Sequence, residues 1–269
     1  MTDQQLADLV YYSNNANPIV LGIENPMLPV LRAALLIPYF ILGCTAGLLL
    51  CIVRPFHPNN TRDCAKLFSW GRYILGVRMT GLNESPVGNG QAVYLANHQD
   101  SLDVFIYPGL LPGNIAILGK KDLMYIPVFG LLFWLARNIF IDRGNKSKAW
   151  ETMATVANLV NKRACALYIF PEGTRSRGKG LLPFKSGAFV LAIEAGIPVV
   201  PICYSSTHKN IDLGRWKSGH ALAKYLEPIS TEGMTKDDVK ALAERCHALM
   251  QEGIAELDAQ IARENGRGG

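Results

Sequence analysis

The sequence predicts an α/β protein: a mixed, largely parallel sheet covered by helices, with an N-terminal hydrophobic helix or hairpin that anchors it to a membrane. Three observations support this prediction. Short apolar runs typical of buried strands alternate with segments whose apolar residues recur at helical spacing. A long stretch without a charged side chain, residues 33–53, precedes this alternation. A histidine and an aspartate, His98 and Asp103, follow the end of one strand-like run.

The uncharged stretch reads AALLIPYFILGCTAGLLLCIV and is long enough to cross the hydrocarbon core of a bilayer, about 30 Å, as one helix. Arg32 is the basic residue before it, whereas several follow: Arg54, Arg62, Lys66, Arg72 and Arg78. This bias predicts that the chain after the stretch lies in the cytoplasm. Pro38 and Gly43 leave a kinked or re-entrant hairpin as the alternative. Residues 1–30 lack the basic and apolar segments of a signal peptide.

Strands and helices are expected to alternate through the rest of the chain. The strand-like runs are residues 92–96, 115–118, 139–141, 164–170 and 197–204, and helical spacing covers residues 148–161, 184–195 and the segment that opens at Thr235. This order is typical of a domain in which helices cover a mostly parallel sheet. The polar, glycine-rich tail, residues 263–269, is expected to be disordered.

Composition limits the partners. The chain of 269 residues is 49% hydrophobic and only 18% charged, and its net charge of +5 favours an anionic partner: a membrane surface, a phosphorylated substrate or a nucleic acid. A nucleic acid is disfavoured because the cations do not alternate with aromatic residues along one element. The six cysteines form no CxxC and do not cluster with the five histidines, so they predict reduced thiols and no metal site.

His98 and Asp103 are candidate catalytic residues because of their spacing. Residues five apart point to different faces of a regular helix, so the two can meet only if His98 lies in the turn before a helix and Asp103 in its first turn. A carboxylate that holds one imidazole nitrogen leaves the other free to accept a proton. Alternatively, Asp103 is only a helix cap and His98 an ordinary polar residue.

A second candidate site is the segment FPEGTRSRG, residues 170–178, which directly follows a predicted strand. Ligands of α/β sheets bind at this end of the strands. Arg175 and Arg177 bring guanidinium groups that suit phosphate oxygens. Lys120, Lys121 and Arg143 also follow strand-like runs and are expected near the same rim. The alternative is a solvated turn. No G-x-S-x-G occurs, so a serine-hydrolase nucleophile is not predicted.

These motifs resemble those of the glycerolipid acyltransferases. The two signature motifs of that family are similar to Asn97-His98-x4-Asp103 and Phe170-Pro-Glu-Gly-Thr-Arg175. Its lesser motifs are similar, in the same order, to Gly119-Lys-Lys, Ile141-Asp-Arg143 and Val199-Val-Pro201-Ile. The likeness extends from about residue 30 to residue 260 and is greatest to the bacterial members that acylate 1-acyl-sn-glycerol 3-phosphate, especially through FPEGTRSRGKGLLPFKSG.

The resemblance implies transfer of a fatty acyl group from acyl-CoA or acyl carrier protein to the sn-2 hydroxyl of lysophosphatidic acid, which gives phosphatidic acid for phospholipid biosynthesis. His98 would be the base and Asp103 would orient it. The substrate phosphate would be bound by the residues Glu172, Gly173, Thr174, Arg175, Arg143 and Lys120, with Arg175 as the main ligand. Backbone amides near the helix start would stabilise the oxyanion. No metal or other cofactor is implied.

The resemblance also implies that residues 1–56 are an N-terminal extension and membrane anchor, and that residues 57–269 are the acyltransferase domain. The protein is then expected at the inner (cytoplasmic) membrane, in contact with membrane lipids, with its catalytic domain facing the cytoplasm. Other readings stay open. One alternative is an acyltransferase whose acceptor is another lysophospholipid or glycerol 3-phosphate. A second is a thioesterase, in which water takes the place of the acceptor. A third is a non-catalytic membrane protein that binds anionic lipids.

Overall fold

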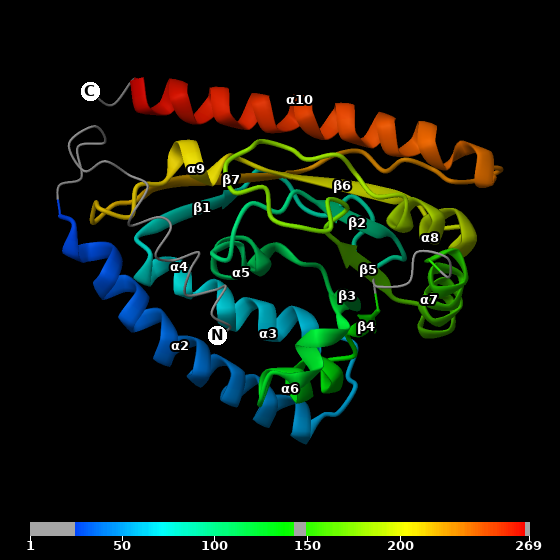
Figure 1. The fold of residues 1–269 in the computed structure, drawn as a ribbon, viewed down its shortest axis with the longest axis horizontal. Coiled ribbons are helices and arrows are strands. Elements are labelled where there is room, and N and C mark those ends of the chain that lie inside the picture. The colour runs from blue at the N-terminus through cyan, green and yellow to red at the C-terminus, as the bar shows by residue number, and fades with distance from the viewer. Residues whose placement is uncertain (1–24, 143–148, 267–269) are drawn as a thin grey trace.

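The computed structural model describes residues 25–142 and 149–266, and its centre is a seven-stranded sheet in the order β1-β7-β6-β2-β5-β3-β4 (Figure 1). The strands are β1 (Val77–Gly81), β2 (Val93–Ala96), β3 (Ile115–Lys120), β4 (Ile139–Ile141), β5 (Ala166–Ile169), β6 (Val199–Tyr204) and β7 (Gly219–Tyr225). All neighbouring strands are parallel except the antiparallel pair β6 and β7. The predicted mixed, largely parallel sheet is confirmed.

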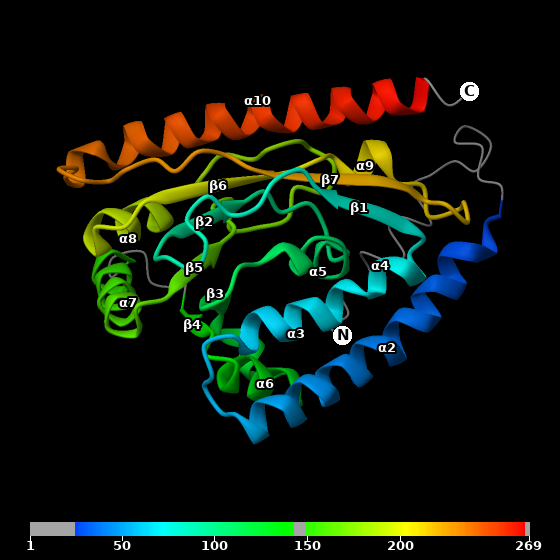
Figure 2. The same cartoon turned by 180° about the vertical axis from the view of Figure 1, so that it is seen from behind.

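Helices cover both faces of the sheet (Figures 1 and 2). One face carries α7 (Ala149–Arg163), α8 (Gly187–Ala195) and α10 (Val239–Gly266), and the other carries α2 (Met27–Val53), α3 (Asn60–Ser69), α4 (Gly71–Ile74), α5 (Asp103–Ile106) and α6 (Phe129–Leu135). The short helix α9 (Thr207–Asn210) follows β6, and 3-10 turns lie at Pro108–Leu110, Lys121–Tyr125 and Lys236–Asp238. Alternate residues of β2 enter the two cores: Val93 and Leu95 face α8, whereas Tyr94 and Ala96 face the α2 side.

Two strands and one helix end differ from the prediction. The segments VRMTG and GHALAKY form β1 and β7, although β1 is only partly buried and neither is a continuous apolar run. Their pairing with each other, rather than their composition, makes them strands. Residues 263–266 were expected to be disordered, but α10 continues to Gly266, and a hydrogen-bonded contact joins Glu264 to His220 of β7. Residues 267–269 lie outside the described part.

The N-terminal apolar segment is one continuous helix, α2, and not a hairpin, although Pro38 lies inside it. It is the one helix among the described residues that is long and apolar enough to cross a membrane. Its buried residues are Leu28, Arg32, Leu36, Cys44, Gly47 and Cys51. They recur mainly every three or four positions and form one stripe, which packs against α3, α4 and α6. Only 22% of its most apolar window is buried, so most of this helix presents apolar side chains outward.

Candidate active site

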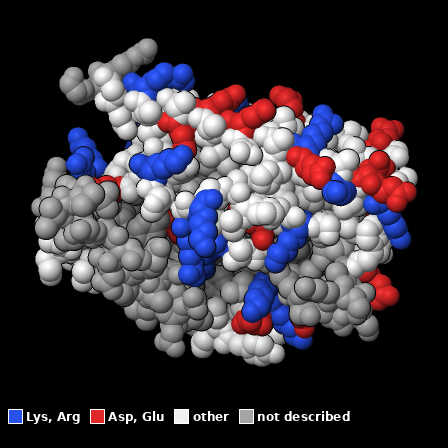
Figure 3. All heavy atoms as spheres, turned by 45° about the horizontal axis from the view of Figure 1, so that its top comes forward, with Lys and Arg blue, Asp and Glu red and all other residues white. Residues whose placement is uncertain are grey.

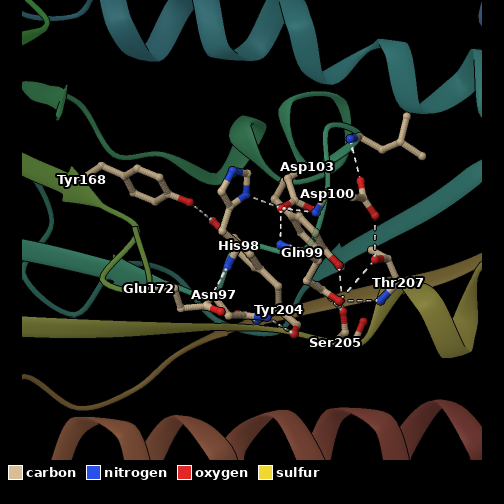
Figure 4. Close-up of polar contacts among 12 residues, drawn as sticks. Asn97, His98, Gln99, Asp100, Asp103, Tyr168, Glu172, Tyr204, Ser205 and Thr207 are labelled. Carbon is tan, nitrogen blue, oxygen red and sulfur yellow. Dashed lines mark hydrogen bonds and ion pairs between the residues drawn. The ribbon is translucent and has the colours of Figure 1, made fainter. Parts of the chain in front are cut away.

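The candidate site lies at one edge of the sheet, where three neighbouring strands end. In register, Leu95 of β2 pairs with Ile169 of β5, and Ala96 pairs with Ile202 of β6. Because these strands are parallel, the segments that follow them, which start at Asn97, Phe170 and Ser205, meet at the same edge. The two motifs that are far apart in sequence are therefore side by side (Figure 4).

His98 and Asp103 meet as the spacing required. His98 lies in the turn after β2, α5 begins at Asp103, and His98 Nδ1 is 2.7 Å from Asp103 Oδ2. The Asp103 side chain is 4% exposed and that of His98 is 20% exposed, so the carboxylate is enclosed while the imidazole still reaches the surface. An ionised carboxylate only accepts hydrogen bonds, so Nδ1 carries the proton and Nε2 is the acceptor.

The same carboxylate shapes the turn. Asp103 Oδ2 also accepts hydrogen bonds from the backbone N–H groups of Gln99 (2.7 Å) and Asp100 (3.2 Å), and Asp100 Oδ1 accepts one from Leu102 N (2.6 Å). These amides at the helix start are thus already bonded to aspartates. The turn thus uses the amides of Gln99, Asp100 and Leu102 to hold its own carboxylates. The expectation that backbone amides near the helix start stabilise an oxyanion stays a prediction.

The imidazole plane is fixed by an aromatic side chain from the second motif. The rings of His98 and Phe170 are stacked, with centroids 4.0 Å apart and an interplanar angle of 15°. The rings of Tyr168 and Phe170 are in a T-shaped contact, with centroids 5.1 Å apart and an interplanar angle of 83°. A stacked ring restricts rotation of the imidazole.

Glu172 joins the two motifs. Its Oε1 accepts from His98 N at 2.7 Å, its Oε2 accepts from Leu182 N at 3.0 Å, and the residue is 2% exposed. Burial raises the pKa of this carboxyl above its ordinary value, against the opposing effect of the two backbone N–H bonds. Further backbone bonds run from Ser176 N to His98 O and from Arg177 N to Gln99 O, both 2.9 Å. The loop is thus tied to both sides of His98.

The segment after β6 supports the turn from its other side (Figure 4). Asn97 exchanges two hydrogen bonds with the backbone of Tyr204, of 3.0 and 2.8 Å. Gln99 Nε2 donates to Ser205 O at 2.9 Å, and Gln99 Oε1 accepts from Thr207 N at 2.8 Å. These polar side chains are all buried. A buried polar group that is fully bonded is rigid, so the turn that carries His98 is positioned before any substrate arrives.

The structure brings most of the predicted residues together. His98 and Asp103 are in contact, and the loop with Glu172, Gly173, Thr174 and Arg175 is bonded to the His98 backbone. Arg175 directly precedes Ser176, which donates to His98 O, and it is half-buried. Gly173 has φ +70°, and a Cβ there would meet the Lys185 side chain at 2.8 Å, so the loop requires glycine.

Two predicted residues are not placed in this group. Lys120 ends β3, which β5 separates from β2, and its ammonium pairs with Asp122. Arg143 lies outside the described residues. Sequence reasoning named Glu172 but not its bond to the His98 backbone, and it missed three supporting residues. Phe170 was visible in the motif without its contact to His98, whereas Gln99 and Thr207 carry no signal until β6 is placed beside β2.

Comparisons with known proteins agree with the residues. Residues 76–205 match a protein family described as Acyltransferase. The chain is 40% identical over 240 residues to 1-acyl-sn-glycerol-3-phosphate acyltransferase of Haemophilus influenzae, covering 89% of this chain and 100% of that protein. It is 38% identical over 243 residues to the protein of the same name from Escherichia coli, covering 90% of this chain and 99% of that one.

The chain belongs to the 1-acyl-sn-glycerol-3-phosphate acyltransferase family. The resemblance inferred from the sequence motifs is therefore confirmed. The fold is also similar to the crystal structure of a 1-acyl-sn-glycerophosphate (LPA) acyltransferase from Thermotoga maritima, with a TM-score of 0.61 at 19% identity, covering 96% of this chain and 97% of that one. The architecture of this acyltransferase family is thus shared at low sequence identity.

Proposed function

We propose that this acyltransferase moves a fatty acyl group from acyl-CoA or acyl carrier protein to the sn-2 hydroxyl of lysophosphatidic acid and forms phosphatidic acid in phospholipid biosynthesis. Membership of the family supports the substrate class. The observation that carries the mechanism is the bond between His98 Nδ1 and Asp103 Oδ2, which leaves Nε2 as the base.

In this mechanism, Nε2 of His98 takes the proton of the acceptor hydroxyl as that oxygen attacks the thioester carbonyl. Asp103 holds the tautomer and stabilises the imidazolium, and Phe170 keeps the ring in plane. When the tetrahedral intermediate collapses, the carbon–sulfur bond breaks, and the imidazolium returns its proton to the departing thiolate. We infer no covalent acyl-enzyme, and the reaction requires no cofactor besides the acyl donor.

Arg175 is proposed to bind the substrate phosphate, and Gly173 and Thr174 to shape the loop that presents it. Its neighbour Ser176 is bonded to the His98 backbone, so a phosphate at Arg175 would lie beside the base. We propose a different role for Glu172 from that of the other five: both of its carboxylate oxygens accept backbone N–H groups, which supports a role in holding the loop rather than the phosphate. Lys120 and Arg143 remain weaker candidates for the same anion.

Residues 1–56 are proposed as the extension and anchor and residues 57–269 as the acyltransferase domain, at the cytoplasmic face of the inner membrane. Because α2 is packed along the domain against α3, α4 and α6, it cannot cross a bilayer without carrying the domain into the lipid. We therefore place α2 along the interface, with its outward apolar side chains in one leaflet.

The test is an assay of purified full-length protein with labelled acyl-CoA and a panel of acceptors: lysophosphatidic acid, other lysophospholipids, glycerol 3-phosphate and water. We expect labelled phosphatidic acid, and roughly a 10²–10⁴-fold loss of rate in His98→Ala, the usual contribution of a general base. His247→Ala, on α10, is the matched control and should keep its activity. Free fatty acid without an acceptor would indicate a thioesterase, and no product would favour a lipid-binding protein.

Arg175→Ala tests the phosphate site. Loss of a ground-state contact should raise KM for lysophosphatidic acid about tenfold or more while kcat changes little. A lysolipid acceptor without phosphate should show no such difference between the two proteins. A collapsed kcat with an unchanged KM would instead assign Arg175 to the transition state or to the structure of the loop.

A further inference from the structure

A group of aromatic and basic side chains, all exposed except the half-buried Arg72, lies beside the N-terminal half of α2. Its members, called here the aromatic–basic rim, are Trp70, Arg72, Tyr73, Arg215, Trp216 and Lys217. Its three aromatic residues are largely exposed: Trp70 is 59% exposed, Tyr73 69% and Trp216 71%. Such large exposed aromatic side chains are unusual on a surface that meets only water.

The rim comes from two separate segments that are fixed together through α2. The buried guanidinium of Arg32 donates to Leu213 O (2.6 Å), Trp216 O (2.9 Å) and Ser218 Oγ (2.5 Å), and so ties the loop of residues 213–218 to the start of α2. The same loop is joined to the end of α4, because Ser218 N donates to Gly76 O at 2.9 Å.

This junction leaves no space between the segments. Gly76 has φ +68°, and a Cβ there would lie 2.2 Å from Trp216 O and 2.4 Å from Arg32 Nη2. The backbone just after α4, the backbone of the 213–218 loop and the Arg32 side chain of α2 are therefore in direct contact. The junction uses the buried side chains of Arg32 and Ser218 and backbone atoms, so the side chains of Trp216 and Lys217 have no part in it. Residues 215–217 are all exposed, and Arg215 Nε lies 3.4 Å from Asp212 Oδ2 at the base of the loop.

The chemistry of the rim matches the headgroup region of an anionic bilayer. Tryptophan and tyrosine prefer this depth, where one part of the ring is in lipid and the other in water. Arg72 lies over the Tyr73 ring at 4.6 Å, and Arg215 and Lys217 flank Trp216. Basic side chains at this level attract anionic lipids by about 1 kcal/mol each. Met27, Val30 and Leu31 of α2, all about half exposed or more, continue the surface with apolar side chains.

We propose that the aromatic–basic rim is a second membrane contact, which binds the anionic headgroups of a phospholipid bilayer while α2 occupies the acyl region. Arg32 is the side chain that fixes the rim relative to α2. The proposal rests on the proposed placement of α2 along the membrane, and it adds that attachment prefers anionic lipid and depends on a loop about 180 residues away in the chain.

The test is flotation of the full-length protein with vesicles of phosphatidylcholine alone and with vesicles that also contain phosphatidylglycerol. We expect the wild type to bind both and to prefer the anionic vesicles. Arg215→Gln/Lys217→Gln should lose about 10- to 30-fold of affinity for the anionic vesicles only, the effect of two surface cations. Trp216→Ser should weaken binding to both kinds. All variants should keep wild-type activity and unfolding temperature in detergent micelles.

Lys162→Gln/Lys240→Gln is the matched control, because it removes the same charge from exposed positions of α7 and α10. If this control loses as much anionic preference as the rim variant, net charge and not the rim is responsible, and the proposal is wrong. It is equally wrong if the rim variant binds like the wild type. A wild type that binds neither vesicle would overturn the placement of α2 itself, and acyl transfer in micelles would still report on the proposed function.

Discussion

Two helices of nearly equal length, α2 with 27 residues and α10 with 28, cover opposite faces of the sheet and meet opposite surroundings (Figures 1 and 2). Both bury one stripe of residues at helical spacing. The outward positions of α10 are charged, polar or alanine, and acidic and basic side chains are interspersed over the face that carries it (Figure 3). The outward positions of α2 are instead uncharged and mostly leucine, isoleucine and valine. The buried stripe shows where a helix packs, whereas its outward face shows which solvent it meets.

The two helices also have one kind of contact in common. In each, a charged side chain forms hydrogen bonds with a loop at the edge of the sheet. From α2, Arg32 donates to the 213–218 loop. From α10, Asp258 accepts from Ser206 N (2.7 Å), Ser206 Oγ (2.6 Å) and Asn210 Nδ2 (3.0 Å). The first contact leads to the proposed membrane surface, and the second leads through Thr207 to the turn that carries His98.

The largest effect is expected from a pair of matched truncations. Met250→Ala on α10 removes a side chain that is 0% exposed and should lower the free energy of unfolding by about 2–5 kcal/mol. Leu42→Ala on α2 removes a side chain that is 67% exposed. It should change the free energy of unfolding by about 0.5 kcal/mol or less and should weaken vesicle binding. Denaturant unfolding in micelles measures the free energy of unfolding, and flotation measures vesicle binding. Equal losses of stability would remove the distinction between the helices.

A smaller effect is expected at the contact between α10 and the site. Asp258→Asn keeps the shape but removes the charge that four donors share, Lys209 Nζ among them, and it should cost about 1–2 kcal/mol of stability. Because Thr207 follows Ser206 and donates to Gln99, kcat should fall several-fold with little change in KM. Steady-state kinetics and denaturant unfolding check this. The control is Glu256→Gln, which breaks an exposed pair with Lys224. A kcat that matches the control would show that α10 does not position the turn.

The smallest effect is the acid sensitivity of the far end of α2. Asp63 of α3 binds Arg54, just after α2, and Arg62. Burial raises the pKa of Asp63, but the hydrogen bonds and charges of the two arginines together hold it below its ordinary value. A depressed folded pKa means that the contribution to stability is complete above the unfolded value of 3.8 and is lost as the pH falls through the folded value. Wild type should therefore lose more stability than Asp63→Asn below about pH 4, by denaturant unfolding. Parallel pH profiles would contradict this coupling.

The candidate site was largely predictable because its two motifs are local. The spacing of His98 and Asp103 allowed one geometry of contact, and the structure has it at 2.7 Å. The position of the FPEGTR segment after a strand placed it at the correct edge. The stacking of Phe170 on His98 and the bonds of Glu172 to the His98 backbone were not predictable, because both depend on β5 lying directly beside β2. Nor does the sequence show that Asp103 already accepts the backbone amides of Gln99 and Asp100 at the helix start.

The sequence by itself determined the alternation of strands and helices, the family, the histidine–aspartate pair and the apolar character of residues 33–53, since each depends on residue types at short spacing. The tertiary structure alone decided that α2 lies along the domain, that β1 and β7 are strands, and that the 213–218 loop reaches the start of α2. The pairing of β1 with β7 and the contact of the 213–218 loop with α2 join residues more than a hundred positions apart, and the position of α2 depends on its contacts with three other helices, α3, α4 and α6. Such contacts form only when the whole chain buries its two cores, and no local pattern encodes them.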